Sequence, residues 1–144
     1  MGLGGAIAFA MGGFGLTYFL SPAWKKRQDG WVELGPLAEI PTGKPMKLDY
    51  ILRKQDGWVT VEGRNSVWVS REGDDITVFS PNCTHLGCAY RWDDAKQSFM
   101  CPCHTGVFSR KGDVVSGPPP RPLDRFLTKV EGGSLFILPK EKTA

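Results

Sequence analysis

The chain has 144 residues, enough for one domain of about 100–150 residues. With 41% apolar and 23% charged residues, its composition is that of a globular protein and excludes a disordered chain. The formal net charge is +3, and every Lys, Arg, Asp and Glu lies beyond residue 20.

The uncharged N-terminal segment, residues 1–20, predicts a single transmembrane anchor. From Leu3 to Leu20 a helix would be about 27 Å long, close to the hydrocarbon thickness of about 30 Å. A cleaved signal peptide is the alternative, but no Lys or Arg precedes the apolar run. A third possibility is that a basic leader precedes Met1 in the native protein.

Residues 21–30, "SPAWKKRQDG", form a predicted flexible linker because they combine Pro, Gly and charge without apolar periodicity. Residues 31–144 form the predicted soluble domain. Its Val-, Ile- and aromatic-rich runs predict an all-β antiparallel sandwich or small barrel. The expected strands are 31–34, 46–52, 57–62, 66–70, 75–80, 126–130 and 134–139. The expected hairpin turns are "KQDG", "REGDD" and "EGGS".

All four cysteines and both histidines lie in two hexapeptides, "CTHLGC" (83–88) and "CPCHTG" (101–106). We call these the first loop and the second loop. Cysteine spacing alone allows two disulfides, a zinc site or an iron–sulfur site. A structural zinc module accepts mixed Cys and His ligands, so this alternative stays open at this point.

The two loops closely resemble those of Rieske iron–sulfur proteins: Cys-x-His, fifteen intervening residues, then Cys-x-x-His. In that family two Cys bind one iron of a [2Fe-2S] cluster and two His bind the other. The extra cysteine in each loop matches the Rieske subunits of cytochrome bc complexes, as do an N-terminal anchor and a linker. The resemblance implies a cluster-binding subdomain at about 80–122 and one [2Fe-2S] cluster.

The resemblance assigns a role to each of these side chains. Cys83 and Cys101 would bind the buried iron, and His85 and His104 the outer iron. A disulfide would join Cys88 to Cys103, pinning the two loops together.

Further roles follow from the same resemblance. The quinone-site docking surface would include Leu86 and Gly87. His104 would accept the hydrogen bond and the proton from quinol. The segment "SGPPPRPL" (116–123), which we call the proline loop, would cover the cluster through Gly117, Pro118, Pro119 and Pro120.

The second loop departs from the usual high-potential pattern "CPCHGS-x-Y". Gly106 replaces the Ser and Phe108 replaces the Tyr, so two hydroxyls that hydrogen-bond the cluster and its ligand are missing. At roughly 1 kcal/mol each, and about 59 mV per ~1.4 kcal/mol, their loss should lower the potential by on the order of 100 mV. Such a potential suits menaquinol. Thr105 or Ser109 could supply a hydroxyl from a shifted position instead.

The implied function is electron transfer as the Rieske subunit of a quinol–cytochrome c oxidoreductase. The implied partners are cytochrome b, a c-type cytochrome and quinol in a dimeric multi-subunit complex, without nucleic acid. The implied location is a bacterial or archaeal cell membrane. A disulfide favours the oxidising outer side, although Lys25, Lys26 and Arg27 favour a cytoplasmic flank. The alternative function is the small Rieske relay subunit of an arsenite oxidase-like molybdoenzyme.

Overall fold

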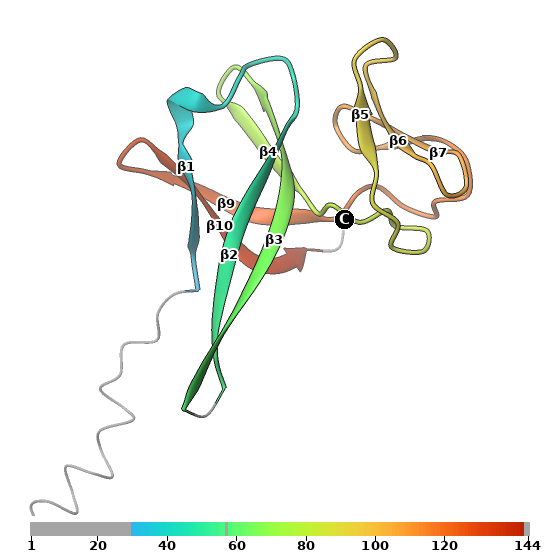
Figure 1. The fold of residues 1–144 in the computed structure, drawn as a ribbon. Helices are drawn as coiled ribbons and strands as arrows, with labels where there is room; N and C mark the ends of the chain where they lie inside the picture. Colours follow the sequence, from blue (N-terminus) through green and yellow to red (C-terminus); the bar gives the residue numbers. More distant parts are fainter. Residues whose placement is uncertain (1–29, 57, 143–144) are drawn as a thin grey trace, which may run out of the picture. The chain divides into compact units, whose positions relative to one another are not determined.

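The computed structural model describes residues 30–56 and 58–142, and Trp31–Ala144 form one compact unit. The unit consists of β-strands and one short 3-10 helix, η1, so the all-β prediction is confirmed (Figure 1). The elements are β1 (Val32–Pro36), η1 (Leu37–Glu39), β2 (Met46–Asp56), β3 (Val59–Glu72), β4 (Asp75–Phe79), β5 (Arg91–Asp93), β6 (Ser98–Cys101), β7 (Gly106–Ser109), β8 (Val114–Ser116), β9 (Arg125–Glu131) and β10 (Ser134–Lys142).

Six strands form the larger sheet, in the order β1-β10-β9-β4-β3-β2, and all their pairings are antiparallel. The sheet curls into a nearly closed barrel. Alternate residues of these strands point inward, as the pleat requires. The core inside the sheet is aliphatic with two aromatic rings: Ile40, Tyr50, Val67, Val69, Val78, Phe126, Leu135 and Ile137.

Four short strands form the second sheet, in the order β5-β6-β7-β8. This sheet and its flanking loops have a separate core, which is mostly aromatic and includes Phe79, Tyr90, Phe99 and Phe108. Trp68 of β3 packs against the same core, with its ring 5.5 Å from that of Phe99. The two predicted cluster loops adjoin this smaller sheet.

The predicted turns "REGDD" and "EGGS" are confirmed, since they join β3–β4 and β9–β10. The predicted turn "KQDG" is displaced, because residues 54–56 still belong to β2 and Asp56 pairs with Val59. The predicted break between residues 62 and 66 is wrong. Gly63 pairs with Leu52, and the β2–β3 register runs without a shift from Asp56↔Val59 to Met46↔Val69. The continuous ladder satisfies the backbone polar groups and tolerates the glycine.

The predicted anchor lies outside the described residues, and no helix among residues 30–56 and 58–142 has the length and apolar character to cross a membrane.

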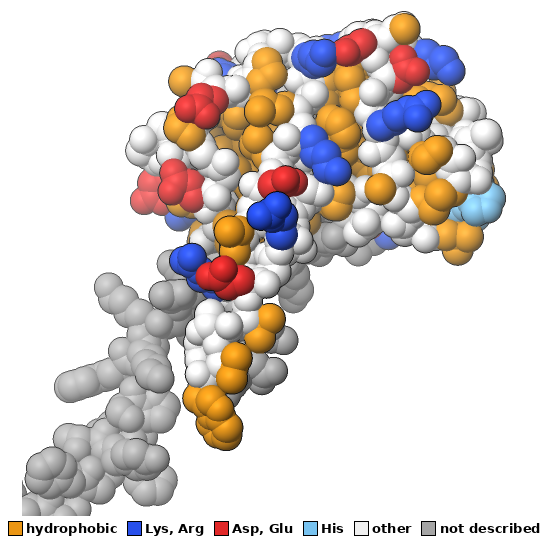
Figure 2. Space-filling model, viewed as in Figure 1, with side chains coloured by type: hydrophobic (Ala, Val, Ile, Leu, Met, Phe, Trp, Pro, Cys, Tyr) orange, Lys and Arg blue, Asp and Glu red, His pale blue; other side chains and the backbone are white. Residues whose placement is uncertain are grey.

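The β2–β3 hairpin projects from the sheet (Figure 1). Apolar side chains gather near its end (Figure 2), including Trp58, which is 95% exposed.

Candidate metal centre

The first loop closes on itself through backbone hydrogen bonds. The Cys83 N–H donates to the Cys88 carbonyl at 2.8 Å, and the Gly87 N–H donates to the Cys83 carbonyl at 2.9 Å. Gly87 has φ +74°, a left-handed conformation that glycine adopts without strain. This turn buries Cys83 and leaves the Leu86 side chain 69% exposed.

The second loop is a hairpin connection between β6 and β7, whose end residues Cys101 and Gly106 pair directly. The turn holds Thr105 at φ +54°, which is unusual for a β-branched residue. The Thr105 hydroxyl donates to the His104 carbonyl at 2.8 Å. Cys101 is buried at the base of this hairpin, whereas His104 is exposed at its end.

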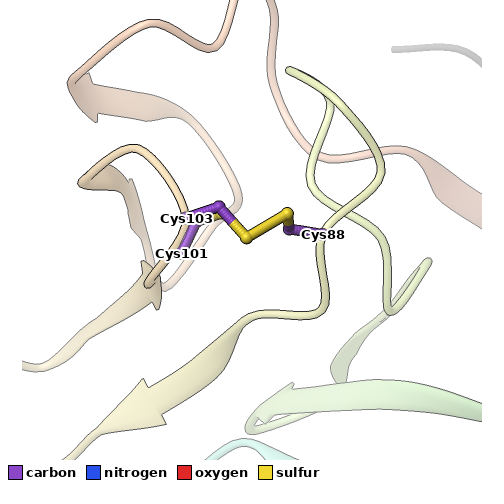
Figure 3. Close-up of side chains that lie close together, drawn as sticks. All are labelled: Cys88, Cys101 and Cys103. Carbon is purple, nitrogen blue, oxygen red and sulfur yellow. A yellow bond between two sulfur atoms is a disulfide. The ribbon is translucent and has the colours of Figure 1, made fainter.

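A disulfide joins the two loops, as predicted. It links Cys88 to Cys103 with a Cα–Cα distance of 6.6 Å, within the usual range for disulfides. The Cys101 sulfur lies beside it, and the three sulfurs are all within 4.8 Å of one another (Figure 3). Because Cys88 and Cys103 are oxidised, the thiols that remain free are those of Cys83 and Cys101.

These two free thiols are buried and interact with each other. Burial raises the pKa of the Cys83 thiol, the hydrogen bond and charge of Cys101 raise it further, and a hydrogen bond from the His85 backbone opposes both effects. Two adjacent buried thiolates repel each other. A bound cation would remove that repulsion and stabilise both thiolates, because metals bind cysteine in its deprotonated form.

The two imidazoles lie together at the outer side of the loops. The ring centroids of His85 and His104 are 4.9 Å apart, with the planes at 87°. His85 is partly buried and His104 is exposed, and imidazole appears at the surface beside apolar side chains in Figure 2. Two buried thiols and two outer imidazoles form a donor set that fits a [2Fe-2S] cluster with one sulfur-bound and one nitrogen-bound iron.

The proline loop contacts both cluster loops. The Thr84 hydroxyl donates to the Arg121 carbonyl at 2.7 Å. Gly117 packs on the Gly106 backbone, and the ring of Pro119 lies where a Cβ on Gly106 would point. The Thr84–Arg121 contact had no signal in the sequence, because its partners are 37 residues apart and lie in different loops.

The hydroxyls near the second loop have other partners. The Thr105 hydroxyl is engaged at the His104 carbonyl. The Ser109 hydroxyl donates to the Asp113 carboxylate at 3.4 Å and accepts from its N–H at 3.1 Å. Phe108 is completely buried in the aromatic core. The arrangement therefore favours the interpretation that neither shifted hydroxyl replaces those absent at 106 and 108.

Comparison with known proteins agrees with this donor set. The profile of the Rieske [2Fe-2S] domain matches residues 30–127. The chain is 34% identical to the menaquinol:cytochrome c reductase iron-sulfur subunit of Bacillus subtilis (strain 168), over 94% of this chain and 84% of that protein. It is 31% identical to the cytochrome b6-f complex iron-sulfur subunit of Chlorobaculum thiosulfatiphilum, over 85% of this chain and 61% of that protein.

Solved structures show the same fold. A chain of a hyperthermophilic respiratory Complex III superposes with a TM-score of 0.54 at 27% identity, over 94% of this chain and 98% of the other. The plasma membrane Rieske protein PetC3 from Synechocystis PCC 6803 gives 0.53 at 28% identity, over 74% and 97%. The paired loops, their disulfide and the matched profile lead to one conclusion: this chain belongs to the Rieske [2Fe-2S] iron–sulfur protein family.

Proposed function

We propose that this chain is the electron-transferring Rieske subunit of a membrane-bound quinol–cytochrome c oxidoreductase, working with cytochrome b and a c-type cytochrome. The observation that carries the proposal is the division of the centre, with two thiols buried and two neighbouring imidazoles that are less buried, of which His104 is exposed. The proposal is further supported by relatives that are themselves subunits of such complexes.

The roles of the residues follow from their burial. Cys83 and Cys101 would hold the inner iron away from water, and His85 and His104 would hold the outer iron at the surface. When bound, the cluster supplies a one-electron acceptor. His104, the more exposed imidazole, would accept a hydrogen bond from the quinol hydroxyl and then its proton.

The surface around the imidazoles suits an apolar, planar reactant. Leu86 lies one residue after His85 and is 69% exposed. Apart from Gly87 and its two chain neighbours, no described residue has a heavy atom within 4 Å of the position that a Cβ on Gly87 would take, so a partner can approach the backbone there. We infer that this part of the first loop docks at the quinol-oxidation site.

The quinol is of the menaquinol type in this proposal. Gly106 and Phe108 offer no hydroxyl, and the hydroxyls of Thr105 and Ser109 have other partners. A reduced, more negative cluster is then less stabilised, so its potential is lower. The proposed anchor (1–20) and linker (21–30) would hold the Rieske domain (31–144) at the outer side of the membrane.

The test is EPR of the dithionite-reduced protein in its native membranes, titrated against potential with and without a quinol-site inhibitor. We expect a Rieske signal that shifts with the inhibitor, and a midpoint well below the top of the Rieske range at about +300 mV. A signal indifferent to the inhibitor would contradict the quinol function and favour the relay subunit of another oxidoreductase. A midpoint near +300 mV would contradict the menaquinol assignment alone.

A further inference from the structure

The proline loop occupies the space that a side chain at position 106 would need. A Cβ built on Gly106 would lie 2.8 Å from Cγ and 3.2 Å from Cδ of Pro119. Real Cβ atoms essentially never approach another heavy atom this closely. Its third neighbour would be the Cβ of Cys101, at an ordinary 3.5 Å. A Cβ at 106 would therefore lie beside Cys101, and among its three nearest atoms only those of the Pro119 ring are too close.

Gly117 brings the proline loop into contact with the same backbone. Its own Cβ would lie 2.8 Å from Cα of Gly106, 2.8 Å from the Thr105 carbonyl oxygen and 3.1 Å from the Gly106 nitrogen. Its φ of +94° is also a conformation that favours glycine. The two glycines thus let the two backbones touch, and they set the depth at which the ring of Pro119 lies.

The proline loop cannot move aside easily. Its Arg121 carbonyl accepts a hydrogen bond from Thr84 at 2.7 Å, and the Arg121 guanidinium binds the carboxylate of Asp124, with one contact at 2.9 Å. Asp124 is buried, and its carbonyl accepts from the Ser80 N–H at 2.8 Å. The ring atoms of Pro119 are bonded to its backbone nitrogen, so displacing them displaces this anchored segment.

We infer that Pro119 is a positioning residue for the redox centre, because it determines whether position 106 can carry a hydrogen-bonding side chain beside Cys101. The absence of a hydroxyl at position 106 thus depends on both Gly106 and Pro119. Replacing Gly106 alone by Ser does not restore the hydroxyl. The inference rests on the proposed function in requiring a cluster bound at Cys101.

The test is a set of variants of the full chain in its native membranes: Gly106→Ser, Pro119→Ala, the double variant, and Gly106→Ala with Pro119→Ala. Pro119→Ala removes both atoms that a serine Cβ would meet. The Ala/Ala variant has the same bulk at 106 without the hydroxyl. The readouts are the midpoint potential from EPR titration and the melting temperature of the visible circular dichroism signal.

We expect Gly106→Ser alone to lower the melting temperature and to change the reduction equilibrium less than about twofold. Added to Pro119→Ala, the same serine should favour reduction about tenfold, which corresponds to about 59 mV, without lowering the melting temperature further. The Ala/Ala variant should match Pro119→Ala in potential. If Pro119 had only a structural role, Pro119→Ala would change the melting temperature. The effect of Gly106→Ser on the potential would then be the same with and without Pro119.

The inference would be overturned if the effects of Gly106→Ser and Pro119→Ala on the potential were additive. It would also be overturned if Gly106→Ser alone showed the full tenfold change with an unchanged melting temperature. If Gly106→Ser fails to assemble and the double variant assembles, the clash is supported; failure of both contradicts it, since removing the ring should relieve the clash. A failure of the proposed function is distinguishable, because the inhibitor response of the wild-type signal tests that function independently.

Discussion

The two cluster loops carry similar donors but differ in their surroundings. The first loop is open: Leu86 is 69% exposed, and a side chain at Gly87 would have no described neighbour within 4 Å. In the second loop, by contrast, Gly106 is buried and touches the proline loop, while His104 and Thr105 are exposed. The difference suggests that Leu86 and Gly87 meet partners beside the exposed His104, whereas Gly106 and the proline loop set the environment of the cluster.

The largest effect should come from removing either inner thiol. Cys83 and Cys101 come from different loops but are both buried, and each would be an essential thiolate ligand. We expect Cys83→Ala and Cys101→Ala each to abolish the Rieske EPR signal. A residual signal in one variant would show that the two loops contribute unequally to binding the cluster, and would contradict the similarity of their donors.

Removing the disulfide should come next. Replacing Cys88 and Cys103 together by Ala removes the covalent link between the loops and leaves neither of its cysteines as an unpaired thiol. For a sequence separation of 15, the loss of cross-link entropy in the unfolded chain is about 3 kcal/mol. Chemical denaturation followed by tryptophan fluorescence measures this loss. An unchanged free energy of unfolding would mean that the proline loop alone holds the two loops together.

The contact of the proline loop with the second loop predicts different costs of substitution at two glycines with similar φ angles. Gly117 has φ +94° and Gly43 has φ +83°, so alanine at either position should cost about 1 kcal/mol of backbone strain. Only at Gly117 would the new Cβ meet backbone atoms at 2.8 Å, and overpacking typically adds about 1–3 kcal/mol. Gly117→Ala should therefore destabilise the domain more than Gly43→Ala. Equal losses would indicate that strain alone acts at Gly117.

The exposure of Leu86 in the first loop predicts that its substitution has the smallest effect on stability. Because Leu86 is largely exposed, Leu86→Ala should change the free energy of unfolding by less than about 0.5 kcal/mol and leave the midpoint potential unchanged. Quinol oxidation should nevertheless slow several-fold. Val115→Ala is the matched control, since Val115 is an equally apolar side chain, 63% exposed, on β8. A slower rate in both variants would argue against docking through Leu86.

The longer strands of the fold were predictable from the sequence, and the shortest strands were not. Most strands of the larger sheet were predictable because they are runs rich in Val, Ile and aromatic residues between turn residues, as in Asp75–Phe79. The strands of the smaller sheet were missed. Arg91–Asp93 and Val114–Ser116 have three residues each, too few for a periodic signal, and they are strands because the hairpins around the loops pair them.

What the sequence determined by itself is the chemistry of the centre. Cys and His occur in this chain only within two hexapeptides, so any site that uses these donors must lie in these two loops. Only the tertiary structure decided how the donors and their neighbours are arranged. The approach of Pro119 to Gly106, and of Thr84 to the Arg121 carbonyl, joins residues from separate loops. Such contacts depend on packing in three dimensions, which no local pattern of residues specifies.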